Sequence, residues 1–277
     1  MIAARPAERG WKLSMSFGNI SFTIEAGIAR LRLNRPAFLN ALSRPLLAEF
    51  REALDQVAAS SGVRVLVLSG EGRAFSSGAD LAAGSTPIGA SGFDAGAVLE
   101  EHYNPIMERL SALPVPVVAA LHGPVVGAAC MLALAADVVV ASRSTYFLQA
   151  FVNIGLVPDA GSSWWLPRLI GVGRASAMMM LGERIPAEKA AEWGMIYEVV
   201  DDEALAERAE AIVTKFANGP TVAYRLTRQA IRSGLTSDFR TALELERQNQ
   251  RTAGSTNDFS EGVAAFREKR KAGFKGI

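Results

Sequence analysis

The stretch of sequence that decides the fold is residues 115–141, which read VPVVAALHGPVVGAACMLALAADVVVA. Short runs of β-branched residues are typical of strands buried on both faces, so we expect strands over Val115–Leu121 and Asp137–Ala141. Between them, residues 127–136 predict a helix built of small side chains. The order of strand, glycine turn, helix and strand recurs through the first two-thirds of the chain, where another buried strand, Val63–Leu68, leads into a glycine-rich turn. This alternation predicts an α/β fold.

The segments that flank this core differ in character. Residues 20–25 and 28–33 alternate apolar and polar side chains around Ala26-Gly27, which predicts a β-hairpin. Ser43 is placed to cap a helix whose apolar residues recur at helical spacing. After Val200 we expect only helices: Asp202–Ala217, Thr221–Ser233, Asp238–Ala253 and Phe259–Lys271. We therefore divide the chain into an N-terminal extension (1–16), a core (17–201) and a C-terminal helical region (202–277).

Composition restricts the class of protein. The 277 residues include 29 Lys+Arg and 28 Asp+Glu, a formal charge of +1, so electrostatics favour neither nucleic acid nor an anionic membrane as partner. The single cysteine, Cys130, excludes an intrachain disulfide and disfavours a cysteine-based zinc site, so we expect a cytoplasmic protein without a metal. Residues 1–16 lack the apolar centre of a secretory signal, and the apolar run Val125–Ala136 is shorter than the ~20 residues of a membrane helix.

Several common catalytic motifs are missing from the sequence. It contains two histidines, no Gly-x-Ser-x-Gly elbow, no Walker A loop and no complete Gly-x-Gly-x-x-Gly. Serine hydrolysis, phosphoryl transfer on a P-loop and hydride transfer on a Rossmann site are therefore disfavoured. The chemistry must rest on backbone groups and a few side chains.

Two segments of small residues are candidates for such backbone chemistry: 74–81 (AFSSGADL) and 122–129 (HGPVVGAA). Small side chains let a ligand approach the main chain, and two N–H groups aimed at one oxygen stabilise an oxyanion. Removing one such donor costs about 3 kcal/mol of transition-state stabilisation in known enzymes. At Ala128 the start of a helix adds the positive end of its dipole. The alternative is that both segments are only tight turns between strand and helix.

A third segment, 153–161 (NIGLVPDAG), contains one acidic residue, Asp159. Its neighbours Val157, Pro158 and Ala160, together with Trp164 and Trp165, predict an apolar setting that raises the carboxyl pKa into the range useful for proton transfer. Asp159 is equally well placed to cap a helix that begins at residue 160 or 161. The residues alone leave both roles open.

Taken together, FSSGADL (75–81), Gly123-(x)3-Gly-Ala-Ala (123–129) and GLVPDAG (155–161) resemble the crotonase, or enoyl-CoA hydratase/isomerase, superfamily. The resemblance extends from about Phe17 to the C-terminus and includes Asn34-Arg-Pro36 and Leu39-Asn-Ala41. It implies a spiral of repeated ββα units, a C-terminal helical trimerisation region, and homotrimers or hexamers built from two trimers.

The resemblance also implies a CoA thioester substrate, whose carbonyl oxygen accepts hydrogen bonds from the N–H groups of Ala79 and Ala128. CoA is then part of the substrate, and no separate cofactor is expected. The substrate-binding residues implied are Ala37, Phe38, Leu39, Ala41, Ser77, Asp80, Leu81, Gly127, Met131 and Phe151.

The resemblance also bears on the reaction. Hydratases of this superfamily hold the attacking water between two glutamates, and the matching positions here are Met131 and Phe151, neither of which can orient water. Isomerases and dehalogenases of the superfamily place a working aspartate at the position of Asp159. Further motifs, including Tyr103-Asn-Pro105 and Leu166-Pro-Arg168, resemble the ring-1,2-epoxyphenylacetyl-CoA isomerases of phenylacetate breakdown, which rearrange a ring epoxide to an oxepin; some also shift a 3-enoyl double bond.

We therefore expect an acyl-CoA isomerase in which Asp159 is the general acid and base. Three alternatives stay open: a 2-enoyl-CoA hydratase, a dehalogenase or hydrolase with Asp159 as nucleophile, and a non-catalytic acyl-CoA binder. Plainer roles also stay open for single residues. Met131 and Phe151 can be ordinary core residues, Asp80 can hold its own loop, and Cys130 is expected to be buried and inert. The loop 82–96, rich in Gly, Ala, Ser and Pro, is expected to shape the acyl pocket.

Overall fold

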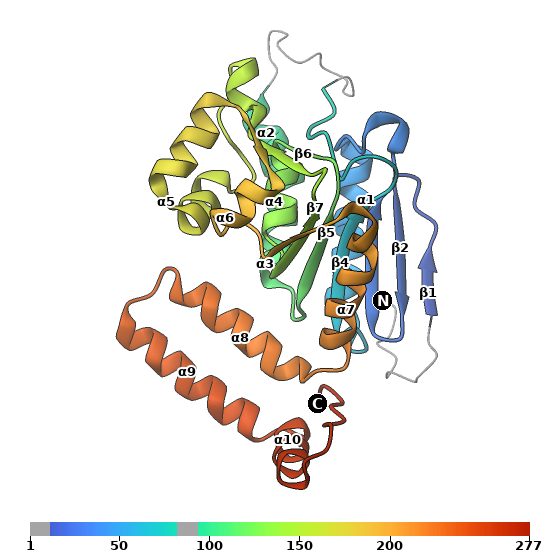
Figure 1. Ribbon diagram of the computed structural model, residues 1–277, viewed down its shortest axis with the longest axis vertical. Coiled ribbons are helices and arrows are strands. Elements are labelled where there is room, and N and C mark those ends of the chain that lie inside the picture. The colour runs from blue at the N-terminus through green and yellow to red at the C-terminus, as the bar shows by residue number, and fades with distance from the viewer. Residues whose placement is uncertain (1–11, 82–93) are drawn as a thin grey trace.

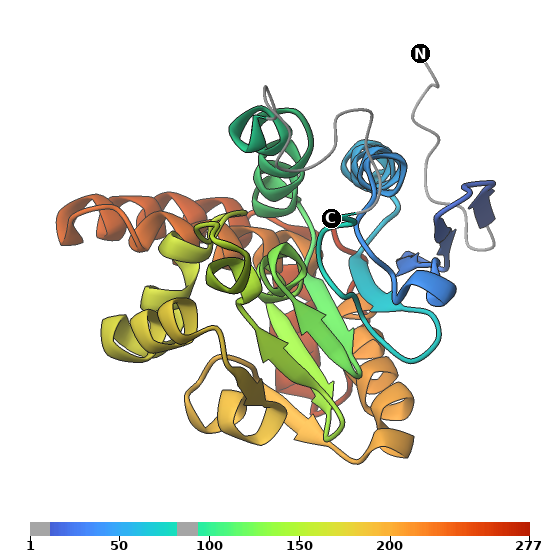
Figure 2. The ribbon, with the colours of Figure 1, turned by 90° about the horizontal axis from the view of Figure 1, so that it is seen from above.

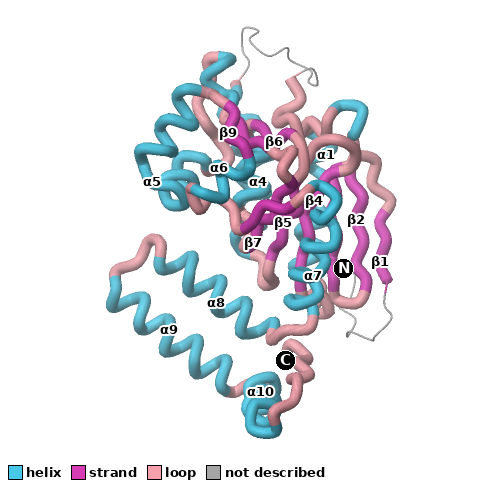
Figure 3. The backbone as a smooth tube through the Cα atoms, viewed as in Figure 1, coloured by secondary structure: helices cyan, strands magenta, loops and turns pink. Residues whose placement is uncertain are grey.

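Two sheets form the centre of the protein in a computed structural model, which describes residues 12–81 and 94–277, with side chains from residue 14 (Figures 1 and 3). The larger sheet has the strand order β1-β2-β3-β4-β5-β7-β10, and the smaller has the order β6-β8-β9. The larger sheet holds β1 (Lys12–Met15), β2 (Ile20–Glu25), β3 (Ile28–Leu33), β4 (Val65–Gly70), β5 (Val117–Leu121), β7 (Val138–Ser142) and β10 (Glu198–Val200). The smaller sheet holds β6 (Pro124–Val126), β8 (Tyr146–Leu148) and β9 (Arg184–Pro186). Neighbours from β3 to β10 pair in parallel, as the βαβ-like alternation predicts.

Each repeat of the chain places one strand in each sheet and then forms a helix. β5 is followed by β6 and by α4 (Ala128–Leu134), and β7 by β8 and, after a 3-10 turn (η3, Ala150–Ile154), by α5 (Ser162–Leu181). The chain that leaves β4 does the same in outline, because Ser76 forms a parallel bridge to Val125 of β6. Between β5 and β6 the turn needs Gly123, whose φ is +57° and where a Cβ would overlap the carbonyl of Arg73. The predicted spiral of ββα units is confirmed.

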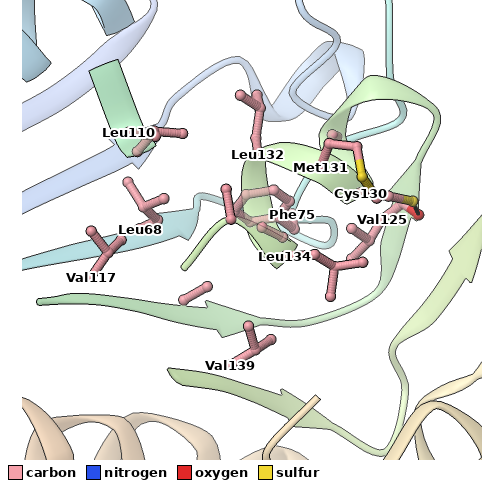
Figure 4. Close-up of a cluster of buried hydrophobic side chains, with 14 of the residues drawn as sticks. Leu68, Phe75, Leu110, Val117, Val125, Cys130, Met131, Leu132, Leu134 and Val139 are labelled. Carbon is pink, nitrogen blue, oxygen red and sulfur yellow. Dashed lines mark hydrogen bonds between the residues drawn. The ribbon is translucent and has the colours of Figure 1, made fainter. Parts of the chain in front are cut away.

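The alternation of side chains along the central strands builds two cores. In β4, Leu66 and Leu68 face the side covered by α1 (Arg44–Ala59), α3 (Asn104–Ala112) and α4, and Figure 4 shows the centre of this cluster. Val65 and Val67 face the other side, where α7 (Leu205–Ala217) covers β4, β5 and β7. Because both faces are covered, the strands are apolar throughout, as buried parallel strands should be.

Helices alone follow β10, as the sequence predicts. A 3-10 turn (η4, Asp202–Ala204) leads into α7, α8 (Thr221–Gly234), α9 (Phe239–Gly254) and α10 (Asn257–Glu268). Figures 1 and 2 show α8 and α9 side by side, extending away from the two sheets. The helix predicted to run to Lys271 ends earlier, because Lys269 adopts a left-handed conformation with φ +54°. Two short elements lie elsewhere in the chain, η1 (Pro36–Phe38) and α6 (Ala187–Glu192).

Arg228 joins α8 to the core. Its Nε donates to both carboxylate oxygens of Asp137 at 2.8 Å, and its guanidinium also donates to carbonyl oxygens at the C-terminal end of α3, including that of Leu113 at 2.6 Å. Arg232, one turn later, donates to the carbonyl of Ala135 at the end of α4 at 3.1 Å. Both cations therefore lie where helix dipoles are negative.

Two further segments differ from the sequence prediction. Instead of one helix over 97–110, α2 (Ala95–Val98) passes through a π-helical turn (η2, Leu99–Tyr103) into α3. Within the predicted N-terminal extension, residues 12–15 form β1 and pair with β2, so this part belongs to the sheet. Residues 1–11, and 82–93 of the loop expected to shape the acyl pocket, lie outside the described residues. No helix within the described ranges is both long and apolar enough to cross a membrane.

Candidate active site

Two backbone N–H groups, those of Ala79 and Ala128, lie on loops that touch each other. Gly78, at φ +89°, packs so closely that a Cβ there would lie 2.8 Å from the carbonyl oxygen of Val126 and 3.8 Å from Cα of Gly127. Ala128 is the first residue of α4, where a helix has no internal acceptor for its N–H. No described residue accepts a hydrogen bond from either N–H. The two loops thus offer free donors, and α4 adds the positive end of its dipole.

Asn40 and Ser76 hold the first of these loops in place. Asn40 is completely buried; its Oδ1 accepts from the N–H of Arg35 at 2.8 Å, and its Nδ2 donates to the carbonyls of Glu71 and Ala74 at 2.9 and 2.8 Å. The Ser76 hydroxyl donates to the Asn40 carbonyl at 2.8 Å and accepts from the N–H of Gly78 at 3.2 Å. Sequence reasoning gave neither side chain a role, and the only signal was their place inside the motifs 39–41 and 75–81.

Asp80 is tied to its own loop. Its Oδ2 accepts from Nη1 of Arg35 at 2.8 Å, and the same nitrogen donates to the carbonyl of Ala41 at 2.6 Å. The Arg35 guanidinium also lies over the ring of Phe38, 4.8 Å from its centroid. The plainer of the two roles considered for Asp80, that of holding its loop, is therefore present in the structure.

The structure brings together the two segments, 37–41 and 77–81, that contain most of the predicted substrate-binding residues. The N–H of Ser77 donates to the carbonyl of Leu39 at 2.9 Å, and the N–H of Leu42 donates to the carbonyl of Gly78 at 2.8 Å. Ala37 is exposed, and so are the large apolar side chains of Phe38 (63%) and Leu81 (53%). Exposed apolar side chains beside free backbone donors are what a ligand with both apolar and polar parts needs.

Asp159 lies in the turn that leads into α5, and its carboxyl is largely withdrawn from water. Its Oδ1 is buried and has no hydrogen-bond partner among the described residues. Burial raises the pKa of this carboxyl to about 7, which agrees with the apolar setting predicted from the sequence. The capping role considered for Asp159 is wrong: the N-cap of α5 is Gly161, and no side chain caps the helix.

Tyr103 lies close to both carboxyls of the site. Its side chain is buried, and its pKa is raised above the ordinary value by burial, by the charge of Asp159 and by the charge of Asp80. The phenol therefore stays protonated and is a hydrogen-bond donor at neutral pH. It comes from the last residue of the π-helical turn η2, a distortion often found at functional sites. The sequence pointed to Tyr103 only as part of the motif 103–105.

Met131 and Phe151 are both buried apolar side chains, and Met131 has the core placement that was considered as its plainer role. Met131 is completely buried within the core cluster, as Figure 4 shows. Phe151 is 8% exposed, and its ring tip lies 3.7 Å from the position that a Cβ on Gly127 would occupy, beside the start of α4. Neither side chain can hold water or accept a proton.

The remaining candidates have structural contacts. Cys130 is buried, its Sγ donates to the carbonyl of Val125 at 2.9 Å, and burial raises the pKa of the thiol to about 12. Nε2 of His122 lies 2.8 Å from the carbonyl oxygen of Gly72 and so holds the turn after β4. Within residues 12–81 and 94–277, no group of three or more His, Cys, Asp and Glu side chains is placed to bind a metal.

The model of the enoyl-CoA hydratase/isomerase family matches residues 23–277. The chain belongs to this family. The 1,2-epoxyphenylacetyl-CoA isomerase of Escherichia coli (strain K12) is 43% identical over 253 residues, covering 91% of this chain and 97% of the relative. A probable enoyl-CoA hydratase of Rhodobacter capsulatus is 42% identical over 262 residues, covering 95% and 100%. The crystal structure of an enoyl-CoA hydratase from Bacillus anthracis is 35% identical with a TM-score of 0.86, covering 94% and 100%. The predicted crotonase superfamily and its α/β fold are confirmed.

Proposed function

We propose that this member of the enoyl-CoA hydratase/isomerase family is an acyl-CoA isomerase, in which Asp159 moves a proton and the N–H groups of Ala79 and Ala128 bind the thioester oxygen. The observation that carries this proposal is the state of Asp159. Its buried, unpartnered Oδ1 and its pKa of about 7 suit a group that must both accept and return a proton at neutral pH.

The reaction follows from these groups. The thioester carbonyl accepts hydrogen bonds from the two N–H groups, which acidifies the C–H bond next to the carbonyl. The Asp159 carboxylate takes that proton, and the electron pair moves onto the carbonyl oxygen to give an enolate. The free donors and the helix dipole stabilise the negative oxygen. The same carboxyl then returns the proton two carbons further along the acyl chain, so the double bond shifts and the composition is unchanged.

A 3-enoyl chain fits this chemistry directly. A ring epoxide fits it if the proton shift is accompanied by cleavage of the ring carbon–carbon bond that the epoxide oxygen spans, which places the oxygen in a seven-membered ring at unchanged composition. The exposed apolar residues Phe38 and Leu81 and the apolar Phe151 support an acyl group with substantial hydrocarbon or aromatic surface. The ring epoxide is supported by the printed name of the Escherichia coli relative, 1,2-epoxyphenylacetyl-CoA isomerase, and so is a place in phenylacetate breakdown. The single cysteine supports action in the reducing cytoplasm.

A 2-enoyl-CoA hydratase is the second candidate, and the Rhodobacter capsulatus relative, named a probable enoyl-CoA hydratase, favours it. Water addition needs a group that orients the attacking water, and Met131 and Phe151 offer none. A dehalogenase or hydrolase requires a covalent adduct on Asp159. A non-catalytic binder requires that Asp159→Asn change only stability.

Mass spectrometry separates these candidates. The protein is incubated with 2-enoyl-, 3-enoyl- and ring-epoxide acyl-CoA thioesters. The products are separated by liquid chromatography against standards of each isomer, because isomers have equal mass, and the mass of each separated product is then measured. Rearranged product of unchanged composition is expected. A product heavier by one water identifies the hydratase, an adduct on Asp159 identifies nucleophilic catalysis, and no conversion of any substrate contradicts the isomerase.

We further propose that the chain acts as a homotrimer or as a hexamer built from two trimers. No residue of α9 is buried, and α8–α10 expose large apolar side chains, among them Phe239 (79%) and Phe266 (86%). Exposed apolar surface on this scale marks an interaction site. Light scattering after gel filtration is expected to give three or six times the 29.5 kDa of one chain, and a monomer or dimer contradicts the proposal.

A further inference from the structure

The turn that carries Asp159 has a strained backbone. Ala160 and Gly161 both have positive φ, +50° and +85°, and the N–H of Ser162 donates to the carbonyl of Asp159 at 2.8 Å. This is the geometry of a type I′ turn, which favours Asn or Gly at both central positions. An alanine in the left-handed region costs about 1–2 kcal/mol, so contacts around the turn must hold it there. Ala160 is 2% exposed, which places its side chain among such contacts.

Ser162 supplies a second bond to the same carbonyl. Its side chain is completely buried, and its Oγ donates to the carbonyl oxygen of Asp159 at 2.7 Å. Both lone pairs of that oxygen are therefore used by one residue. For Ala160 to relax toward negative φ, the peptide group between Asp159 and Ala160 must rotate. This rotation turns the Asp159 carbonyl away and breaks both hydrogen bonds from Ser162.

Gln149 connects Ser162 to the oxyanion side of the site. Gln149 is completely buried, and its Oε1 accepts at 3.3 Å the longer branch of the hydrogen bond whose shorter branch runs from the Ser162 hydroxyl to the Asp159 carbonyl. Its side chain also lies beside the thiol of Cys130 in α4, where it offsets part of the rise in the thiol pKa that burial causes. Gln149 thus lies between α4, whose first N–H belongs to Ala128, and the turn that carries Asp159.

We propose that Ser162 is a positioning residue that fixes the Asp159 carboxyl relative to the oxyanion donors. Ser162 holds the backbone of Asp159 and acts on the substrate only through it. The proposal rests on the proposed function in one respect, that Asp159 is the group that moves the proton. Fixed placement matters because a misplacement of about 1 Å at a reacting group costs on the order of a hundredfold in rate.

The test compares Ser162→Ala with Ser163→Ala, because Ser163 is the next residue, is exposed, and does not bond to Asp159 in the described structure. For the double-bond shift, Ser162→Ala is expected to lower kcat about tenfold or more, to leave KM within about twofold, and to move the pH profile of kcat/KM. Ser163→Ala is expected to match the wild type. If Ser162→Ala keeps the kcat and the pH profile of the wild type, the positioning role of Ser162 is overturned.

A second measurement tests the positioning role of Ser162 even if the wild type isomerises none of the substrates. Infrared difference spectroscopy follows protonation of the Asp159 carboxyl, whose band is identified by its loss in Asp159→Asn. The titration midpoint is expected to shift in Ser162→Ala and to stay in place in Ser163→Ala. An unchanged titration midpoint in both variants rejects the positioning role of Ser162. If the wild type shows no turnover but the midpoint shifts in Ser162→Ala, only the proposed function is rejected.

Discussion

At the scale of single residues, the site depends on withdrawing Asp159 from water. Burial raises the pKa of the carboxyl to about 7, and the same burial makes its charged form unfavourable in the folded protein. Activity and stability are therefore linked through one side chain, and each gives a prediction.

The first prediction concerns activity and pH. In the proposed reaction Asp159 is the base and must be deprotonated in the free enzyme, so kcat/KM for isomerisation is expected to rise about tenfold per pH unit below 7 and to level off above it. Initial rates between pH 5 and 9 measure this. A flat profile over pH 5–8 shows that another group limits the reaction.

The second prediction concerns stability and pH. The folded state holds the Asp159 proton more tightly than the unfolded chain, so it binds more protons between about pH 4 and 7, and stability falls as pH rises through that window. Asp159→Asn removes this cost. The variant is expected to be more stable than wild type at pH 8, by up to about 4 kcal/mol, with a smaller advantage at pH 5. Urea unfolding at both pH values tests this. A stability advantage of Asp159→Asn that is larger at pH 5 than at pH 8 contradicts the prediction.

At the scale of elements, the first residue of α4 supplies one of the two backbone N–H groups proposed to bind the substrate oxygen. A proline is tolerated at the first position of a helix, yet it removes the N–H. Ala128→Pro is therefore expected to lower kcat about 10²–10³-fold while the protein stays folded. Rates and thermal unfolding are measured together. Activity within a few-fold of wild type in a folded Ala128→Pro variant means that this N–H does not bind the substrate oxygen.

The elements also show what the sequence can and cannot reveal. The hairpin around Ala26-Gly27, the buried strands and the C-terminal helices were predictable, because each depends on a pattern within a few neighbouring residues. The roles of Asn40, Ser76 and Ser162 were not, because each depends on a carbonyl that only tertiary folding brings within reach. The same holds for the Asp159 side chain, where local sequence allowed a helix cap and the left-handed Ala160 and Gly161 prevent it.

At the scale of the whole molecule, the helical arm of α8 and α9 is joined to the spiral through Arg228. This guanidinium is 6% exposed and holds Asp137 together with three carbonyls, those of Leu110, Ser111 and Leu113. Arg228, with Arg232 one turn later, therefore connects the spiral core with the helices proposed to form the oligomer.

Arg228→Met is expected to lower the free energy of unfolding by about 3–5 kcal/mol, because it leaves the Asp137 charge and the carbonyls without their main partner. Arg225→Met, an exposed arginine on the same helix, is the matched control and is expected to change it by less than about 0.5 kcal/mol. Urea unfolding measures both. Equal effects of the two substitutions contradict the anchoring role of Arg228.

The proton transfer itself is the central claim, and liquid chromatography with mass spectrometry of a 3-enoyl-CoA thioester incubated in deuterated water tests it most directly, because chromatography separates the two isomers and the mass shows any added water or deuterium. Wild type and Asp159→Asn are compared in the same buffer. We predict that wild type yields the 2-enoyl isomer without added water, and that Asp159→Asn forms it at least about a hundredfold more slowly. Addition of water by the wild type, or isomerisation by Asp159→Asn within a few-fold of the wild-type rate, contradicts the account.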